Sequence, residues 1–177
     1  MLYAISLGSM KMNEIELYTT DDINGNPIYY IDEECTKSYT GCTEDYFQGV
    51  LCRKAEVVDG YYDGICKDYY QLSDKLEMIS QMKYNLQNGL VIEFFSTGVV
   101  KAIALVIQNY DVDYIIYNED GTIDTKGFWP NEPKFPFFKE EDMTKIKELR
   151  EKYDLMKIHE EIVRYGVNFN YQKYFGL

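Results

Sequence analysis

Polar and apolar positions repeat along the middle of the chain. A glycine is followed by three variable residues, a polar residue and two large aromatic residues. This pattern occurs as GCTEDYF from Gly41, GICKDYY from Gly64 and GLVIEFF from Gly89, at intervals of 23 and 25 residues. Self-similarity at a nearly fixed period indicates an array of equivalent structural units.

Two further stretches fit the pattern less completely. A fourth copy ends at Tyr117, which lies 23 residues after Phe94. A partial copy at the N-terminal end finishes with the aromatic pair Tyr29 and Tyr30. We therefore expect the array to occupy residues 24–125.

Each unit has the properties of one β-hairpin. Aromatic and β-branched residues favour strands, and Gly after Asn or Asp favours the left-handed backbone of tight turns. The predicted turns are Asn24-Gly25, Asp59-Gly60, Asp63-Gly64, Asn88-Gly89 and Asp120-Gly121. Since a single hairpin is only marginally stable in water, we expect successive hairpins to stack into one antiparallel meander.

The pattern changes after the array. Residues 126–138 contain three prolines and the single tryptophan, which predicts an extended or turn-rich connector. From 140 to 165 apolar residues recur at helical spacing behind an acidic first turn, without proline or glycine. We expect one amphipathic helix that covers the last hairpin, and binding of a partner is the alternative role for it. Alternating apolar residues in the tail, 167–177, predict one more strand.

These patterns predict a mainly β protein, an antiparallel meander of stacked hairpin repeats with a C-terminal capping α-helix. The length of 177 residues and the hydrophobic content of 46% fit one domain with a modest core. Residues 1–23 form an N-terminal segment that is either an extra strand or a non-native start. The repeats take 24–125, and the connector, helix and tail take 126–177 of the same domain.

The spacing of glycines and aromatic pairs resembles the bacterial variant of the MORN repeat. The sequence departs from that repeat after Tyr70, where Ser73 stands in place of a closing glycine, and at Tyr117, which Asn118 follows instead of a second aromatic residue. In bacteria, proteins with such repeats look like surface or scaffold proteins in some cases and antitoxin or immunity proteins in others. The resemblance therefore implies a shape, and function must be sought in the residues that the shape carries.

Acidic residues are concentrated in the first part of the chain. The formal net charge is −12, and residues 1–74 hold 14 Asp and Glu against five Lys and Arg. Such a field repels nucleic-acid phosphates and anionic membranes and attracts a basic partner. The alternative is that the acids only keep a tyrosine-rich sheet soluble and its edges unpaired. The candidate acidic patch consists of Asp32, Glu33, Glu34, Glu44, Asp45, Glu56, Asp59 and Asp63.

Tyrosine is unusually frequent, with 18 residues. Its ring covers apolar neighbours while its hydroxyl stays hydrated, and tyrosine is common at protein interfaces. Most of these rings are expected to build the ladder between hairpins. The candidate aromatic anchors for a partner are Tyr30, Tyr39, Tyr61 and Tyr62.

The sequence contains no recognisable catalytic arrangement. The single histidine, His159, has no serine, cysteine or aspartate arranged around it in the sequence. The four cysteines lack zinc-site spacing, namely Cys35, Cys42, Cys52 and Cys66. We therefore expect no enzyme activity, no metal and no cofactor. The stretch MLYAISLGSM lacks the basic start of a secretory signal and is too short for a membrane span, so we expect a cytoplasmic protein with reduced cysteines.

These observations favour an immunity or antitoxin protein that neutralises a cognate toxin domain by direct contact. A basic toxin such as a nuclease would be steered by the carboxylates and fixed by the aromatic side chains. The alternative is a repeat scaffold or surface-associated interaction protein without a toxin partner. Neither nucleic acid nor a membrane is expected as a partner, and the sequence leaves self-association open.

Overall fold

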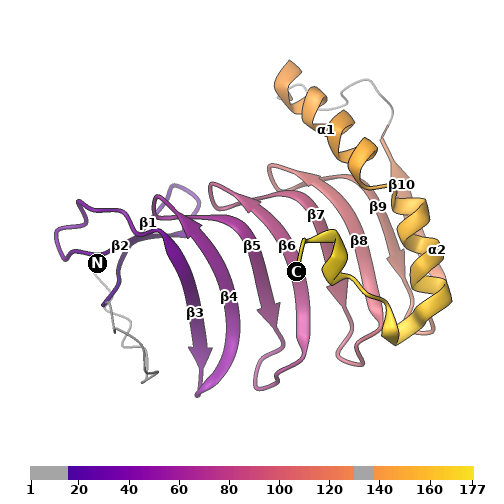
Figure 1. The fold of residues 1–177 in the computed structure, drawn as a ribbon, viewed down its shortest axis with the longest axis horizontal. Coiled ribbons are helices and arrows are strands. Elements are labelled where there is room, and N and C mark those ends of the chain that lie inside the picture. Colours follow the sequence, from indigo (N-terminus) through magenta and orange to yellow (C-terminus); the bar gives the residue numbers. More distant parts are fainter. Residues whose placement is uncertain (1–15, 130–137) are drawn as a thin grey trace.

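A computed structural model of the protein describes residues 16–129 and 138–177. Eight antiparallel strands form one meander in which neighbouring strands are consecutive in sequence (Figure 1). They are β3 (Gly41–Phe47), β4 (Val50–Val58), β5 (Tyr61–Tyr69), β6 (Leu76–Lys83), β7 (Leu86–Phe94), β8 (Val100–Ile107), β9 (Tyr110–Tyr117) and β10 (Ile123–Phe128). The predicted mainly β meander of stacked hairpins is therefore confirmed.

Tight two-residue turns join β4 to β5, β6 to β7 and β8 to β9. They are Asp59-Gly60, Tyr84-Asn85 and Gln108-Asn109, and all six residues have positive φ. Asparagine tolerates the left-handed backbone of such turns better than most other residues with a side chain. The Asn85 side-chain oxygen accepts the Tyr62 N–H at 2.7 Å, and that of Asn109 accepts the Gln87 N–H at 2.7 Å. Each asparagine thereby ties its own turn to the preceding hairpin.

Two of the predicted turn glycines, Gly64 and Gly89, instead lie inside β5 and β7. Their φ angles are +123° and +145°, and register shifts lie close to both. The Glu56 and Gln81 side chains cross over the glycines and occupy the space that a Cβ would need. The turn prediction is wrong at these positions because the glycines serve bulges and close side-chain approach.

The aromatic residues of the repeat occupy equivalent positions near the ends of alternate strands. Tyr46, Tyr69, Phe94 and Tyr117 lie there in β3, β5, β7 and β9. A register shift directly precedes each of the first three. Tyr46 and Tyr69 are half-buried, whereas Phe94 and Tyr117 are buried. The prediction that these aromatic residues occupy equivalent positions is thus confirmed, and the ladder of rings is fully covered only in its later half.

The first hairpin is separate from the meander. Strands β1 (Tyr18–Asp21) and β2 (Pro27–Tyr30) form a two-stranded sheet around the predicted turn at Gly25. The array predicted from residue 24 is therefore not one continuous sheet. Asn85 Nδ2 joins the hairpin to the meander by donating to Asp22 Oδ2 at 3.1 Å. Strand β1 lies in the segment 1–23, and residues 1–15, to which the alternatives of an extra strand or a non-native start apply, lie outside the described residues.

Helices α1 (Glu140–Lys152) and α2 (Leu155–Tyr165) lie against the later strands of the sheet on one side, called the front face below (Figure 1). The single helix predicted over 140–165 is wrong in one respect, because it is interrupted at Tyr153 and Asp154. Asp154 Oδ1 accepts the N–H groups of Met156 and Lys157 at 3.1 and 3.2 Å, and so caps a new helix. Both helices pack apolar residues on the sheet, as expected of a capping segment.

The main core lies between the front face and the helices. Its fully buried sheet residues are Ile79, Leu90, Ile92, Val100, Ile103, Leu105, Ile107, Val112 and Ile115. The tail adds Phe169 and Phe175, which directly follow the short 3-10 turns Gly166–Asn168 and Gln172–Tyr174, so the predicted final strand is wrong. Its alternating apolar residues anchor turns and pair with no strand among the described residues. Phe138, at the end of the predicted connector, is also buried in this core, and residues 130–137 lie outside the described residues.

The opposite side of the sheet, the back face, holds two smaller clusters. One lies under the first hairpin and consists of Tyr29, Ala55, Val57, Tyr62 and Cys66. The other consists of Val91, Ala104 and Val106 on β7 and β8. The apolar core is therefore unequal, with most of it in the later half of the chain.

Candidate functional site

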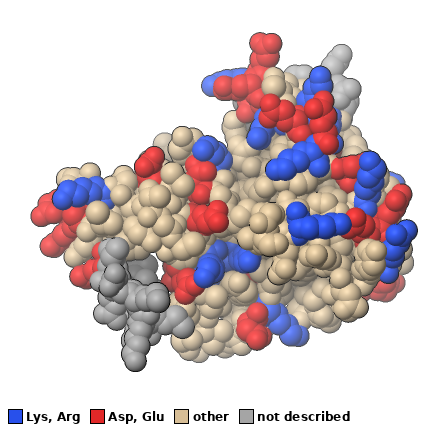
Figure 2. Space-filling model, in the orientation of Figure 1, with Lys and Arg blue, Asp and Glu red and all other residues tan. Residues whose placement is uncertain are grey.

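One end of the molecule carries a strong excess of negative charge. This end is built by β1, β2 and the loop that leads to β3, and Figure 2 shows its acidic side chains at the left. Residues 16–37 contain one lysine and six acids, which are Glu16, Asp21, Asp22, Asp32, Glu33 and Glu34. We call these six residues the acidic end.

Separate parts of the chain contribute to the acidic end. The pKa of the Tyr18 hydroxyl is raised by desolvation and by the carboxylates of Glu16, Glu33 and Glu34. One tyrosine therefore experiences acids from both the residues before β1 and the loop before β3. The carboxylates of Glu33 and Glu34 are exposed and accept no hydrogen bond from any described residue. They are available to an external cation.

Asp22 and Asp32, by contrast, hold the local backbone. Asp32 Oδ1 accepts the Lys37 N–H at 2.8 Å, and Asp22 Oδ1 accepts the Asn26 N–H at 2.9 Å. Desolvation alone would raise the pKa of Asp22, but hydrogen bonds from Asn26 and Asn85 outweigh it and lower the pKa to about 2. These two acids are structural as well as charged.

The predicted acidic patch does not form one surface. Only Asp32, Glu33 and Glu34 lie at the acidic end, and the other five acids are distributed over β3, β4, β5 and the turn between β4 and β5. Most of those five have partners within the sheet. Glu44 lies 2.6 Å from the Lys54 ammonium, Asp63 lies 2.7 Å from that of Lys83, and Glu56 accepts the Ile65 N–H at 2.8 Å. Asp59 occupies the turn itself.

Asp45 belongs to a charged row across the back face. Asp45, Arg53 and Asp68 are direct neighbours on β3, β4 and β5. Arg53 Nε donates to Asp68 Oδ1 at 2.6 Å, and the guanidinium lies 5.5 Å from the centre of the Tyr62 ring. Burial raises the pKa of Asp45, although the charge of Arg53 opposes this effect. The sequence could not reveal the row because only strand register brings these residues together.

Two of the predicted aromatic anchors have structural roles. Tyr62 is buried, and its hydroxyl lies 2.7 Å from that of Tyr29. The Tyr39 ring covers Gly41, and its hydroxyl donates to the Cys42 carbonyl at 2.9 Å. Tyr62 is therefore not available to a partner. The Tyr39 side chain packs on and bonds to the first residues of β3.

The other two anchors remain at the surface. Tyr30 and Tyr61 are half-buried, at the end of β2 and at the start of β5. The Tyr61 ring meets that of Tyr84 edge to face at 6.0 Å between centroids, and Tyr84 is 61% exposed. Tyr84 was not predicted as a surface residue because its turn, Tyr84-Asn85, contains no glycine. Tyr61 and Tyr84 together offer an aromatic surface beside the first tight turns.

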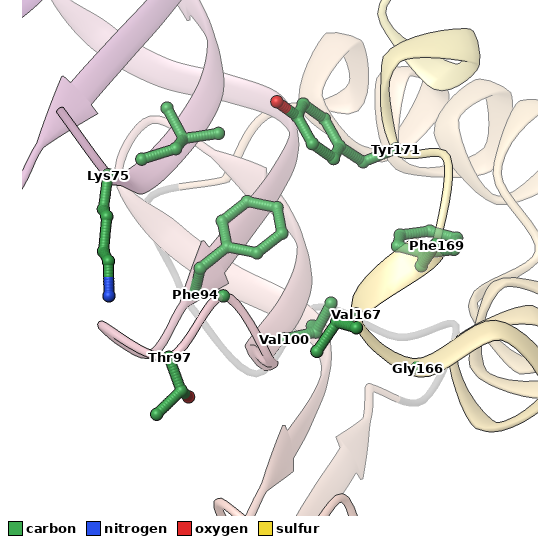
Figure 3. A pocket seen from close by; sticks show the side chains of 10 residues that line it. Lys75, Phe94, Thr97, Val100, Gly166, Val167, Phe169 and Tyr171 are labelled. Atoms are coloured by element: carbon green, nitrogen blue, oxygen red, sulfur yellow. The ribbon is translucent and has the colours of Figure 1, made fainter.

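An apolar cavity of about 250 Å³ lies where the tail meets the sheet (Figure 3). Phe94 forms one wall, and Val167 and Tyr171 from the tail face it across the cavity. The centroid of the Tyr171 ring lies 5.1 Å from that of Phe94. Lys75 lines the mouth, but its ammonium donates to the Ser96 carbonyl at 2.6 Å. The cavity thus has apolar walls and few groups that could orient a polar ligand.

A second cavity, of about 300 Å³, lies between α1 and strands β5 to β7. Lys145 and Lys152 of α1 line it opposite Asp63, and Glu148 lies between them along the helix. The Asn88 side-chain oxygen is buried here without a partner among the described residues. Because acidic and basic groups balance, the cavity favours neither anions nor cations.

The described residues offer little for catalysis. Within 16–129 and 138–177, no three His, Cys, Asp or Glu residues are grouped so that they could hold a metal ion. His159 stacks on Tyr117, with Nδ1 3.1 Å from its hydroxyl. All four cysteines are free thiols, and burial raises the pKa of Cys66 to about 12, which opposes thiolate chemistry. In the same ranges, no helix combines the length and apolar character needed to cross a membrane.

Comparisons with protein-family models, with curated proteins and with solved structures find no match for this chain. The resemblance to MORN-variant repeats therefore stays a prediction. The acidic end is the most distinctive surface, and the sequence analysis missed half of it. The missed residues are Glu16, Asp21 and Asp22, which precede the first repeat. The excess of acids over lysine in residues 16–37 is the signal that could have identified them.

Proposed function

We propose that the protein is an immunity or antitoxin protein that neutralises a basic toxin domain by binding it with the acidic end. The observation that carries this proposal is the concentration of six carboxylates beside one lysine at one end of the molecule (Figure 2). Carboxylates further along the sheet are largely paired with lysine, arginine or backbone N–H groups, whereas Glu33 and Glu34 are not. Unpaired exposed acids are the ones free to attract a cationic surface.

The mechanism is electrostatic steering followed by steric blockade. Opposite fields accelerate association, up to about 10⁸–10⁹ M⁻¹s⁻¹ at low salt. The half-buried rings of Tyr30 and Tyr61 would then fix the partner beside the first hairpin. Because the four cysteines are free thiols, a reducing compartment such as the cytoplasm suits the protein, and a toxin acting there would be the target.

The test removes the four acids of this end that do not hold the backbone. Glu16→Gln, Asp21→Asn, Glu33→Gln and Glu34→Gln are combined, and the control variant changes four exposed acids of α1, Glu140, Glu141, Glu148 and Glu151, to glutamine. Binding to the product of the neighbouring gene is measured at several salt concentrations. We expect the first variant to associate at least about tenfold more slowly and the control to associate normally. Salt should mimic the first variant, since screening acts within about 8 Å at physiological ionic strength.

Growth of cells that express the neighbouring product gives the second measurement. The unmodified protein and the α1 variant should protect these cells, and the acidic-end variant should protect them less. If no neighbouring product is toxic, the immunity function is wrong, and the scaffold alternative takes its place. If protection and association rate both survive the neutralisation, the acidic end is not the contact surface.

A further inference from the structure

Strand β3 is one edge of the eight-stranded sheet (Figure 1). One side of its backbone pairs with β4, and no strand of the described residues pairs with the other side. From Gly41 to Asp45 the pairing with β4 runs without a register shift, and within this stretch the Tyr39 hydroxyl already donates to the Cys42 carbonyl. A regular edge presents N–H and C=O groups with which another strand can pair.

The other edge strand, β10, shares several features with β3. Each strand has a register shift, between Ile123 and Thr125 and between Asp45 and Tyr46, and in each a tyrosine ring lies against a glycine. The two strands differ in charge. β10 carries one acid and one base, Asp124 and Lys126, whereas β3 carries the consecutive acids Glu44 and Asp45. Of the two edges, β3 is therefore the one that presents a pair of acids to a basic segment.

Two rows of charged side chains end at β3. On the back face the row alternates in sign and runs Asp68, Arg53, Asp45 across β5, β4 and β3. On the front face Lys67 of β5 lies opposite Lys54 of β4, and Glu44 of β3 follows with 2.6 Å between its carboxylate and the Lys54 ammonium. Both rows end on a carboxylate at the edge. A further strand would pair opposite charges if it placed a basic side chain beside each acid.

The positions of the two acids define the sequence of such a strand. Glu44 and Asp45 are consecutive and therefore project to opposite faces of the sheet. Residues that pair with them are consecutive as well. The incoming strand thus needs two adjacent basic residues within an otherwise extended segment.

We propose that the edge of β3 binds an extended segment of a partner protein that contains two consecutive basic residues, by addition of a strand to the sheet. A second copy of this chain is the poorer occupant, because antiparallel self-pairing brings the two acids close to the same acids of the other copy. This inference rests on the proposed function in one respect, since the segment would belong to the toxin. Recognition of the segment itself can be tested without any toxin.

The probe is a synthetic octapeptide that alternates threonine and valine around a central Lys-Arg pair. Its controls replace Lys-Arg with Glu-Asp, or place proline at two central positions and so remove strand N–H groups. Hydrogen exchange of the full chain is followed by nuclear magnetic resonance with and without each peptide. We expect the basic peptide alone to protect alternate amides between Gly41 and Phe47, because every second amide of β3 faces away from β4.

Two matched variants test the charge pairing. Glu44 and Glu93 each accept a hydrogen bond from a lysine, at 2.6 and 2.8 Å, and are 32% and 37% exposed. Glu93 lies on β7 in the interior of the sheet. Glu44→Gln should weaken peptide binding about threefold, the size expected for one exposed ion pair, and Glu93→Gln should leave it unchanged.

Several results would overturn the inference. These are absence of peptide binding, protection of β10 instead of β3, or equal loss of affinity in the two variants. Concentration-dependent protection of β3 in the free protein would assign the edge to a second copy. A neighbouring toxin that is neutralised without protection of β3 leaves the proposed function intact and refutes only strand addition. If the peptide binds β3 and no neighbouring product is toxic, strand addition is supported and the proposed function is refuted.

Discussion

Phe94 represents the aromatic ladder at the scale of a single residue. Its ring is 6% exposed, belongs to the main core and packs against the half-buried Tyr171. The same ring forms a wall of the cavity beside the tail (Figure 3). Removal of the Phe94 ring would enlarge this cavity. Because the surrounding side chains do not fill the cavity now, we expect them not to fill the larger space.

Phe94→Ala should therefore reduce the free energy of unfolding by about 3–5 kcal/mol, the range for a buried phenylalanine. Tyr171→Ala removes a half-buried ring and should cost about 1 kcal/mol, mainly the edge-to-face contact. Urea unfolding of both variants measures the difference. Equal losses would show that the tail side of the contact is as important as the sheet side.

Asp22 gives a residue-scale prediction for pH. Its pKa in the folded protein is about 2, below the ordinary value of 3.8, so the unfolded chain binds the proton more tightly. The stabilisation is present above about pH 4 and is lost as the pH falls towards 2. Asp22→Asn should flatten the fall of the melting temperature between pH 5 and 2. Asp21→Asn is the control, because the Asp21 carboxylate accepts no hydrogen bond from any described residue.

The exposure of single side chains was the least predictable property at this scale. Tyr61 and Tyr62 are adjacent in sequence, yet one stays at the surface and the other is buried against Tyr29. Strand alternation requires opposite faces for the two residues, but the sequence does not say which face the first hairpin covers. That choice depends on contacts such as the one between Asn85 and Asp22, which join distant parts of the chain.

At the scale of elements, α1 is fixed to the sheet by an ion pair. Arg150 donates from Nε and Nη2 to the two carboxylate oxygens of Asp113, both at 2.7 Å. Nη2 also donates to the Trp129 carbonyl at 2.7 Å. Asp113 lies on β9 and is only 4% exposed. The arginine therefore connects α1, β9 and the residue that follows β10.

Arg150→Met should lower the free energy of unfolding by about 3–5 kcal/mol, because it leaves a buried carboxylate without its cation. Combining it with Asp113→Asn removes that charge and should recover part of the loss. Chemical denaturation of the two single variants and the double variant forms a double-mutant cycle. Additive losses would mean that the two side chains do not interact energetically.

The type and order of elements were predictable, whereas their connections were predicted only in part. The period of the aromatic pairs predicted the hairpins because strand length and turn length both follow from it. Glycine alone could not distinguish a turn at Gly60 from a bulge at Gly64, since both need positive φ. The break before α2 had a local signal in Asp154, a good capping residue, which helical periodicity concealed.

At the scale of the whole molecule, the apolar core is lopsided. The main cluster joins β6, β7, β8 and β9 to both helices and the tail, whereas β4 and β5 share a small cluster with the first hairpin. Local unfolding free energies follow the density of buried contacts. The end that carries the acids is therefore the less stable end of the sheet.

Native-state hydrogen exchange should reveal this gradient. Amides of β7, β8 and β9 should exchange slowest, and those of β3 and the first hairpin should exchange through local openings that need little denaturant. The measurement is exchange at increasing sub-denaturing urea concentrations. Uniform protection from β3 to β9 would indicate that the sheet opens only as a single unit.

The position of the covering elements at the C-terminal end also affects synthesis of the chain. Each hairpin of the meander can form soon after it leaves the ribosome, because its partner strand is adjacent in sequence. The front face of β6 to β9 then stays uncovered until α1, α2 and the rings of Phe169 and Phe175 have been made. The nascent chain therefore passes through a stage with a formed sheet and an exposed apolar face, when chaperone binding or aggregation is most favoured.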